Sequence, residues 1–418
     1  MTTQSEQSSS RKANIYYGWW IAGEFAITQT IAWGIVYYSF TVFITSMEAE
    51  LGWSRSTITG ASSLALLISG FMALPVGYWI DHYGGRWLMT TGVTVASVLV
   101  FAWSHVESVW AFYLIWSLMG VTMAAILYEP AFAVIAHWFI RHRGRALALV
   151  TFAAGFASTI FLPLSDWLLE KQGWRGAVQT LAIILAIGTI PLHALILRRK
   201  PKDIGLNPDG ASEAEHLIHQ SKNPSISFAD AIKSTEFWWL TAGFSLAALG
   251  VIAIRYHFIL LLIDRDFTPR FAAGAGGAIG AMQVAGRVIF APLSERIPSR
   301  TVTAGLFLIL AFSMLILRYI PTTTGVILFV IVFGAAYGAI TLARPSMLAD
   351  YFGSEHYGRI SSIMAVFFTL ASTFAPLGAS WLYDWWGSYD RILWVLAIIM
   401  ILSIGATLMI PSHTHTLD

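Results

Sequence analysis

Apolar runs of about twenty residues recur along the whole chain and are separated by short polar connections. A helix needs about 20 mostly apolar residues to cross a bilayer, so each run predicts one membrane-spanning helix. The first six are predicted at residues 17–46, 56–80, 87–104, 109–138, 146–168 and 175–197. The second six are predicted at 237–263, 270–293, 301–318, 324–350, 359–382 and 390–410. The pattern therefore predicts an all-α membrane protein with twelve transmembrane helices in two six-helix bundles.

A polar interval between the two sets is predicted to be a linker. It holds Arg198, Arg199, Lys200, Lys202, Lys222 and Lys233 together with Pro201, Pro208 and Pro224. Its end, residues 227–232, has the character of a short helix at the membrane surface. The predicted division is a disordered N-terminal segment (1–15), an N-terminal bundle (16–198), a linker (199–235), a C-terminal bundle (236–411) and a tail (412–418).

Composition supports this class. Hydrophobic residues make up 56% of the chain and charged residues only 11%, whereas a soluble domain carries about 25% charged residues. Such a surface is stable only against lipid. The chain contains no cysteine, which excludes disulfides, thiolate nucleophiles and cysteine-ligated metals.

The distribution of Lys and Arg predicts the orientation. Most of them fall in connections on one side of the predicted spans, including the linker and the cluster Arg141, Arg143 and Arg145. Cytoplasmic connections carry the excess of positive charge. Both termini are therefore expected in the cytoplasm, and the protein in the inner (plasma) membrane with many passes.

The two predicted bundles repeat each other in sequence. Glu129-Pro130 matches Arg344-Pro345, Gly144-Arg145 matches Gly358-Arg359, and Trp167-Leu168 matches Trp381-Leu382, at nearly one offset. Several matches at a nearly constant offset indicate a duplicated six-helix unit.

One connection carries a recognisable motif, Gly77-x-x-x-Asp81-x-x-Gly84-x-Arg86. Gly77 permits close approach of another helix, Gly84 permits a tight turn, and Asp81 can cap a helix end or accept from a cation. The motif resembles the loop signature of the major facilitator superfamily, in which it latches the two bundles in the outward-facing state. The resemblance implies that fold for nearly the whole chain and a gating role for these four residues.

Other stretches resemble the monocarboxylate-transporter and oxalate–formate-exchanger branch of that family. They are Tyr16-Tyr17-Gly18-Trp19-Trp20, Gly52-Trp53-Ser54-Arg55, Gly173-Trp174-Arg175 and Leu382-Tyr383-Asp384. In that branch an arginine at the place of Arg287 binds the substrate carboxylate, and many relatives pair it with an aspartate one turn earlier. Here Gln283 stands in that place, which puts proton coupling through the aspartate in doubt.

Charged residues within predicted spans are the candidates for function, because a charge there costs a few kcal/mol. Arg287 and Arg255 are candidate anion contacts, since a guanidinium grips a carboxylate with two hydrogen bonds. His257 and Glu24 are candidates for carrying a proton. For each of the four, a structural role is the alternative.

Four aromatic residues are candidate walls of a substrate pocket: Trp33, Tyr37, Tyr128 and Tyr337. Packing or lipid contact is the alternative reading for each. Glu129 and Arg344 occupy matching places in two spans, and we expect them to pair across the two halves at an inner gate. The alternative for Arg344 is direct contact with substrate.

These observations predict a secondary active transporter that moves a small, monocarboxylate-like organic anion by alternating access, with proton-coupled uptake. The chain lacks a Walker A sequence, His-Glu-x-x-His and Gly-x-Ser-x-Gly, so we expect no enzyme activity, catalytic residue, metal or cofactor. The expected partners are the substrate, protons and the lipid bilayer, with no nucleic acid, and the expected state is a monomer. Export of drugs or metabolites, uptake of a larger vitamin-like or aromatic acid, and ligand sensing without transport remain alternatives.

Overall fold

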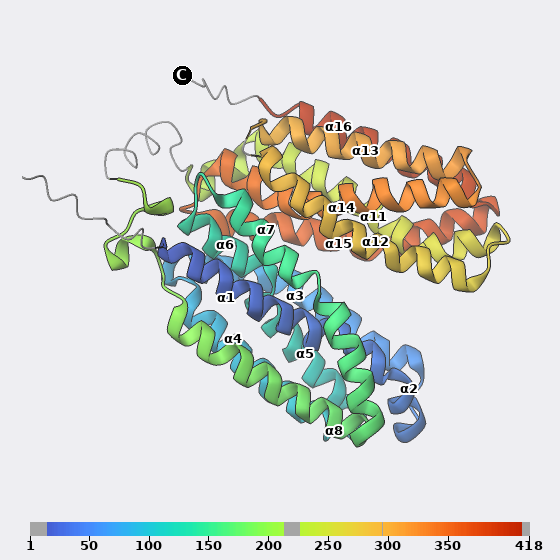
Figure 1. The fold of residues 1–418 in the computed structure, drawn as a ribbon, viewed down its shortest axis with the longest axis horizontal. Helices are drawn as coiled ribbons and strands as arrows, with labels where there is room; N and C mark the ends of the chain where they lie inside the picture. The colour runs from blue at the N-terminus through green and yellow to red at the C-terminus, as the bar shows by residue number, and fades with distance from the viewer. Residues whose placement is uncertain (1–14, 213–225, 295, 412–418) are drawn as a thin grey trace, which may run out of the picture.

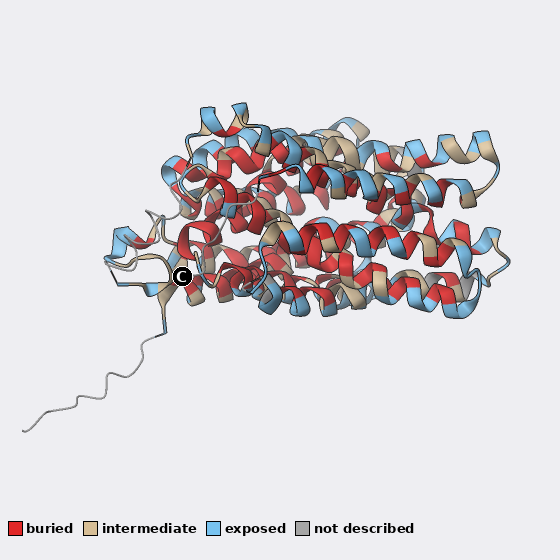
Figure 2. Ribbon diagram, turned by 90° about the horizontal axis from the view of Figure 1, so that it is seen from above, coloured by how far each residue is buried: buried red, intermediate tan, exposed pale blue. Residues whose placement is uncertain are grey.

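A computed structural model describes residues 15–212, 226–294 and 296–411. Outside these ranges lie most of the predicted N-terminal segment, the central part of the linker and the C-terminal tail. Within them, all regular structure is helical. Two helical bundles converge at the end that holds the linker and diverge toward the other end (Figure 1). Buried positions run along the inner faces of the helices in both bundles (Figure 2).

The N-terminal bundle contains helices α1 to α8. Their bounds are α1 Tyr17–Ala32, the π-helix η1 Trp33–Tyr38, α2 Phe40–Leu51, α3 Arg55–Tyr83, α4 Gly85–Trp103, α5 Val109–Ile126, α6 Tyr128–Trp138, α7 Arg143–Ala154 and α8 Ala157–Ile196. Gly84 lies between α3 and α4 with φ of 78°, a conformation that glycine adopts without strain, so the chain reverses there within one residue.

The C-terminal bundle follows the linker. Its bounds are α11 Thr235–Asp264, α12 Pro269–Ser294, α13 Ser299–Tyr319, α14 Thr323–Phe352, α15 Tyr357–Trp386 and α16 Tyr389–Leu408. The described part of the linker contains two short 3₁₀ turns, η2 Pro201–Ile204 and η3 Pro208–Gly210, and helix α10 Phe228–Lys233. Helix α10 confirms the short helix expected at the end of the linker, and Ser227 Oγ caps it by accepting from Asp230 N at 3.2 Å.

Ten described segments are long and apolar enough to cross a membrane. One of them, Arg143–Ile196, has 54 residues, far more than one crossing requires. Gly173 interrupts α8 within it with φ of 69° and ψ of 170°. The all-helical, many-pass character of the prediction is confirmed, and the number of twelve spans stays a prediction.

Helix irregularities occur at three places within the predicted spans of the N-terminal bundle, and the apolar pattern of the chain does not predict them. The first span changes from α- to π-helix at Trp33–Tyr38, α5 and α6 are separated at Leu127, and α7 and α8 are separated at Gly155 and Phe156. Irregular backbone at membrane depth is tolerated where it is buried in protein or lines a cavity. Such breaks therefore direct attention to the side chains around them.

Pro130 contributes to the break at Leu127. Pro130 has no N–H to donate to the carbonyl of Ile126, four residues earlier in the chain. Gln29 of α1 replaces that donor, since its Nε2 donates to Ile126 O at 2.7 Å. The carbonyl is thus satisfied by a neighbouring helix, and Tyr128 is placed at the start of α6.

Candidate functional site

Aromatic side chains form a continuous wall where two of these irregularities meet. The ring centroid of Trp33 lies 5.2 Å from that of Tyr37 and 4.9 Å from that of Tyr128. Tyr37 in turn lies 5.1 Å from Tyr38, and Tyr128 stacks on Phe132 at 5.0 Å. Three of the four predicted pocket aromatics, Trp33, Tyr37 and Tyr128, are therefore brought together in the N-terminal bundle.

Tyr38 belongs to this wall and was missed by the sequence reading. An α-helix of 3.6 residues per turn brings Tyr37, at i+4, close to Trp33 and turns i+5 away. The wider π-helical turn brings Tyr38 closer to the same side. The sequence around Tyr38 does not predict its place in the wall, because a π-helix depends on the packing of neighbouring helices.

Arg255 of α11 faces this wall from the other bundle. Its Nη1 donates to the hydroxyl of Tyr337 at 3.1 Å, and its guanidinium lies 5.3 Å from the centroid of that ring. Tyr37 and Tyr38 both lie within electrostatic reach of Arg255 and of Tyr337. Among the residues that the structure describes, no acid pairs with Arg255, and its side chain is exposed.

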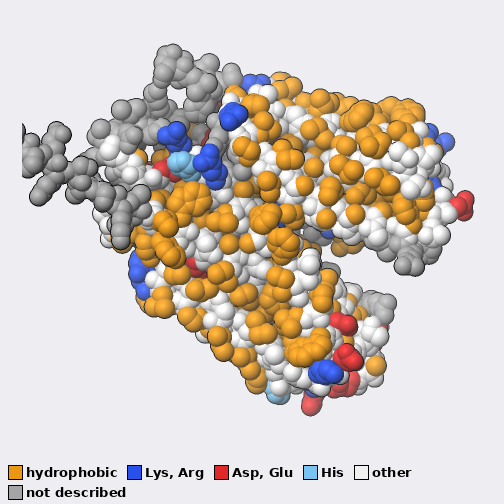
Figure 3. Space-filling view, in the orientation of Figure 1, with side chains coloured by type: hydrophobic (Ala, Val, Ile, Leu, Met, Phe, Trp, Pro, Cys, Tyr) orange, Lys and Arg blue, Asp and Glu red, His pale blue; other side chains and the backbone are white. Residues whose placement is uncertain are grey.

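Arg255 and Tyr37 have exposed side chains although both lie inside the spans. The space-filling view shows a cleft between the two bundles that widens away from the linker end (Figure 3). The predicted pocket residues Tyr37 and Tyr337 belong to different bundles, so a ligand there would contact both. This arrangement presents one exposed cation and ring faces from both halves.

Arg287 has a different environment from Arg255. It is buried, and its Nη1 donates to the backbone carbonyl of Thr151 in α7 at 2.5 Å, across the two bundles. Gln283, the residue one turn before Arg287, is half-buried. Its backbone packs closely against α14, since a Cβ at Gly338 would lie 2.0 Å from Gln283 O. In this conformation Arg287 is buried and engaged by the Thr151 carbonyl, and it lies within electrostatic reach of Tyr38 and Tyr128.

His257 and Glu24, the predicted proton carriers, each lie inside a single bundle. His257 Nε2 donates to Pro376 O at 3.1 Å, since a carbonyl can only accept, and Nδ1 lies within hydrogen-bond distance of Tyr389 OH, at 3.0 Å. Glu24 Oε1 lies 2.6 Å from Nδ1 of His193 in α8, and both side chains are at most 2% exposed. The structure places neither residue beside Arg255, and His193 was not among the predicted residues.

At the linker end, the motif residues join the two bundles. Asp81 of α3 accepts from the backbone N–H of Gly358 at 2.8 Å and of Arg359 at 2.9 Å, the first turn of α15. The side chain of Arg359 lies 3.5 Å from the same carboxylate. A carboxylate at a helix N-terminus is favoured by the free N–H groups and the helix dipole.

The close approach of α3 and α15 depends on two glycines. A Cβ at Gly77 would lie 2.1 Å from Gly358 O, and a Cβ at Gly358 would lie 2.5 Å from Gly77 O. The fourth motif residue, Arg86, does not cross the interface. Its Nε donates to Ala194 O at 2.9 Å, near the end of α8 in its own bundle.

Glu129 and Arg344 also meet across the bundles, as the sequence analysis expected. One carboxylate oxygen of Glu129 accepts from Arg344 Nη2, and the other accepts from Ser361 Oγ at 2.8 Å. A further cross-bundle pair, Arg143 Nη1 with Asp350 Oδ1 at 3.2 Å, was not predicted. The end that carries the linker is thus closed by several charged contacts, while the opposite end is open.

Comparisons with known proteins bear on this architecture. The model of the "Major Facilitator Superfamily" matches residues 25–342 and 280–416. "Monocarboxylate transporter 13" of Bos taurus is 23% identical over 402 residues, which cover 94% of this chain and 89% of that protein. "Riboflavin transporter RibJ" of Trypanosoma brucei brucei is 27% identical over 195 residues, 44% of this chain and 34% of that protein. The solved structure of FucP, a major facilitator transporter in the outward conformation, superposes with a TM-score of 0.71 at 13% identity, covering 95% of this chain and 99% of that one.

Proposed function

This chain belongs to the Major Facilitator Superfamily, and on that premise we propose that it takes up a monocarboxylate-like organic anion by alternating access. The family and the fold are those of a many-pass membrane transporter rather than of an enzyme. The main support for an anionic substrate is the environment of Arg255. A guanidinium at membrane depth is costly unless it finds an acceptor of opposite charge, and no acid among the described residues provides one.

The relatives support this substrate class. A protein named as a monocarboxylate transporter aligns over nearly the whole chain, and a monocarboxylate is an anion with one negative charge. One arginine without an acidic partner suits such an anion, because its fork can donate two hydrogen bonds to one carboxylate. We propose the inner (plasma) membrane as the location, and a proton as the coupling ion.

The closed linker end and the open opposite end support alternating access. With the termini and the linker in the cytoplasm, as the Lys and Arg distribution predicts, the cleft would open to the outside. Asp81 and Glu129, together with their partners in the C-terminal bundle, would then hold the inner gate closed. An anion that binds Arg255 of one bundle and the rings of the other would favour closure of the outer end.

The test is exchange of labelled carboxylates in proteoliposomes at two pH values, with wild type and with the Arg255→Gln variant. We expect Arg255→Gln to raise the substrate Kd about tenfold to a hundredfold, because hydrogen bonds to charged groups contribute about 1.5–3 kcal/mol. Arg255→Lys should fall between the two, since it keeps the charge and loses the fork. Faster exchange under an inward proton gradient would support coupling.

The matched control is Arg391→Gln, on the exposed side of α16. It removes the same charge from the C-terminal bundle and should leave the Kd unchanged. Unaltered carboxylate binding by Arg255→Gln would contradict the assignment of Arg255. Absence of exchange for every carboxylate tried would contradict the anion function itself.

A further inference from the structure

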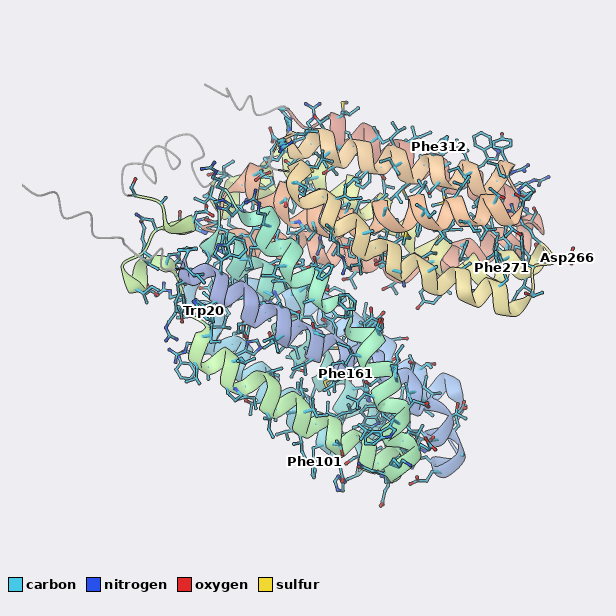
Figure 4. The ribbon with its side chains drawn as sticks, viewed as in Figure 1. Trp20, Phe101, Phe161, Asp266, Phe271 and Phe312 are labelled. Atoms are coloured by element: carbon cyan, nitrogen blue, oxygen red, sulfur yellow. The ribbon has the colours of Figure 1, made fainter. Side chains whose placement is uncertain are left out.

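The π-helix Trp33–Tyr38 is held in place by two specific contacts. Gly34 lets α8 approach so closely that a Cβ there would lie 2.1 Å from Cδ2 of Phe161, the residue labelled on α8 in Figure 4. Ser39 closes the wide turn, since its N–H donates to Gly34 O at 2.9 Å, and Ser165 Oγ of α8 donates to Ser39 Oγ at 2.7 Å. A π-helical turn is rare and is frequently found at functional sites.

The rings that this turn presents form a fixed surface. Trp33 is packed between Tyr37 and Tyr128, and Tyr128 is backed by Phe132 with nearly parallel rings, 11° apart. Only the outer part of this surface is accessible, and Tyr37 is 39% exposed. The opposite bundle contributes a second ring, Tyr337, stacked on Phe333 at 6.0 Å.

Among Arg255, Arg287 and Arg344, only Arg255 has an exposed side chain in this conformation. Arg287 donates to Thr151 O and Arg344 pairs with Glu129, and both contacts cross the bundles at the closed end. Among the described residues, the hydrogen bond of Arg255 goes to the phenol hydroxyl of Tyr337. One available cation next to ring faces matches a ligand with one negative charge and a flat aromatic ring.

We propose that the transported anion is an aromatic monocarboxylate, whose carboxylate pairs with Arg255 and whose ring lies between Tyr37 and Tyr38 on one side and Tyr337 on the other. This assignment rests on the proposed organic-anion function and narrows it. A two- or three-carbon acid would satisfy Arg255 and leave the ring faces in contact with water. An aromatic ring covers them and adds ring–ring contacts beyond the buried area.

The experiment is calorimetric titration of the purified full-length protein in lipid nanodiscs with four probes. Benzoate carries both features, cyclohexanecarboxylate lacks the aromatic ring, benzamide lacks the charge, and propionate lacks the ring altogether. We expect benzoate to bind about tenfold more tightly than cyclohexanecarboxylate, because each ring–ring contact contributes to the preference. Benzamide and propionate should bind weakly.

Variants distinguish the contribution of the aromatic rings to binding from that of Arg255. Tyr37→Leu and Tyr38→Leu should each lower the preference for benzoate over cyclohexanecarboxylate, and Tyr37→Phe should retain it. Phe312→Leu, on the outer face of α13 (Figure 4), is the matched control and should change nothing. Arg255→Gln should weaken both carboxylates alike.

The outcomes distinguish the two levels of the proposal. If cyclohexanecarboxylate or propionate binds as tightly as benzoate, the aromatic assignment is wrong and the organic-anion function stands. The aromatic assignment is equally wrong if Tyr37→Leu and Tyr38→Leu leave the benzoate preference intact. If no carboxylate releases or absorbs heat on titration, the anion function fails as well.

Discussion

Neutralising either Glu129 or Arg344 should nearly abolish transport, and exchanging their charges should restore a measurable part of it. The two side chains pair across the bundles at the closed linker end. Removing one partner leaves the other charge half-buried without its counter-ion, which costs about 3 kcal/mol at the lower end of the range for buried pairs. That cost falls only on the conformation in which this end is closed, so the balance between the two states should shift about a hundredfold.

The measurement combines exchange assays with cysteine cross-linking, which detects whether the linker end is closed. Because the chain has no cysteine, cysteines introduced at the exposed His82 and Glu355 would be the only thiols in the protein. We expect rapid cross-linking between them in wild type, slow cross-linking in Glu129→Gln and Arg344→Gln, and partial recovery in the variant with both charges exchanged.

A control distinguishes loss of the Glu129–Arg344 pair from loss of an ion pair elsewhere in the protein. Arg265 Nη2 and Asp390 Oδ1 lie 2.7 Å apart within the C-terminal bundle, away from the interface. Asp390→Asn should leave the cross-linking rate of the linker end unchanged. If the charge exchange restored neither exchange activity nor cross-linking, the pair would not be the gate, and direct substrate contact by Arg344 would become the better interpretation.

The sequence predicted this pair because two independent features coincided. Glu129 and Arg344 carry opposite charges within apolar spans, and they occupy matching positions of the internal repeat. An uncompensated charge in a span needs a partner, and the repeat placed the two at the same depth. The Asp81 contact was foreseeable on similar grounds, since a carboxylate next to Gly77 and Gly84 can reach a helix N-terminus.

Other parts of the site depend on packing that the sequence does not display. Pro130 breaks the span between α5 and α6, whereas Pro345 at the matching place leaves α14 continuous. A proline alone therefore does not determine a break. The π-helix depends on Gly34 fitting against Phe161, a contact between distant segments.

The roles of single polar residues were harder still to predict. Arg287 was a candidate substrate contact on the basis of family resemblance, with a structural role as the alternative, and in this conformation it donates to a backbone carbonyl of the other bundle. The sequence did not predict that Glu24 lies next to His193, because the two residues are far apart in the chain and share no motif. Hydrogen-bond partners across helices follow from the relative placement of the helices, which periodicity alone leaves open.

Gly77→Val should hold the linker end open and abolish transport, and Gly77→Ala should already have a large effect. A Cβ at Gly77 would lie 2.1 Å from Gly358 O and 2.6 Å from Gly358 C. Both are backbone atoms of α15, so no side chain can rotate away to make room. The helices must separate, and separation breaks both hydrogen bonds from α15 to Asp81, each worth about 1.5–3 kcal/mol as bonds to a charged group.

The glycines of the chain also provide the comparison that makes this prediction specific. Gly378 belongs to α15 as well, and a Cβ there would meet nothing within 4 Å. Gly378→Ala should therefore keep both transport and rapid cross-linking between cysteines at His82 and Glu355, whereas Gly77→Ala should slow the cross-linking at least tenfold. Asp81→Asn should act in the same direction more weakly, because the amide oxygen still accepts one of the two N–H groups. Equal cross-linking in Gly77→Ala and Gly378→Ala would show that α3 and α15 need not meet at Gly77 to close the linker end.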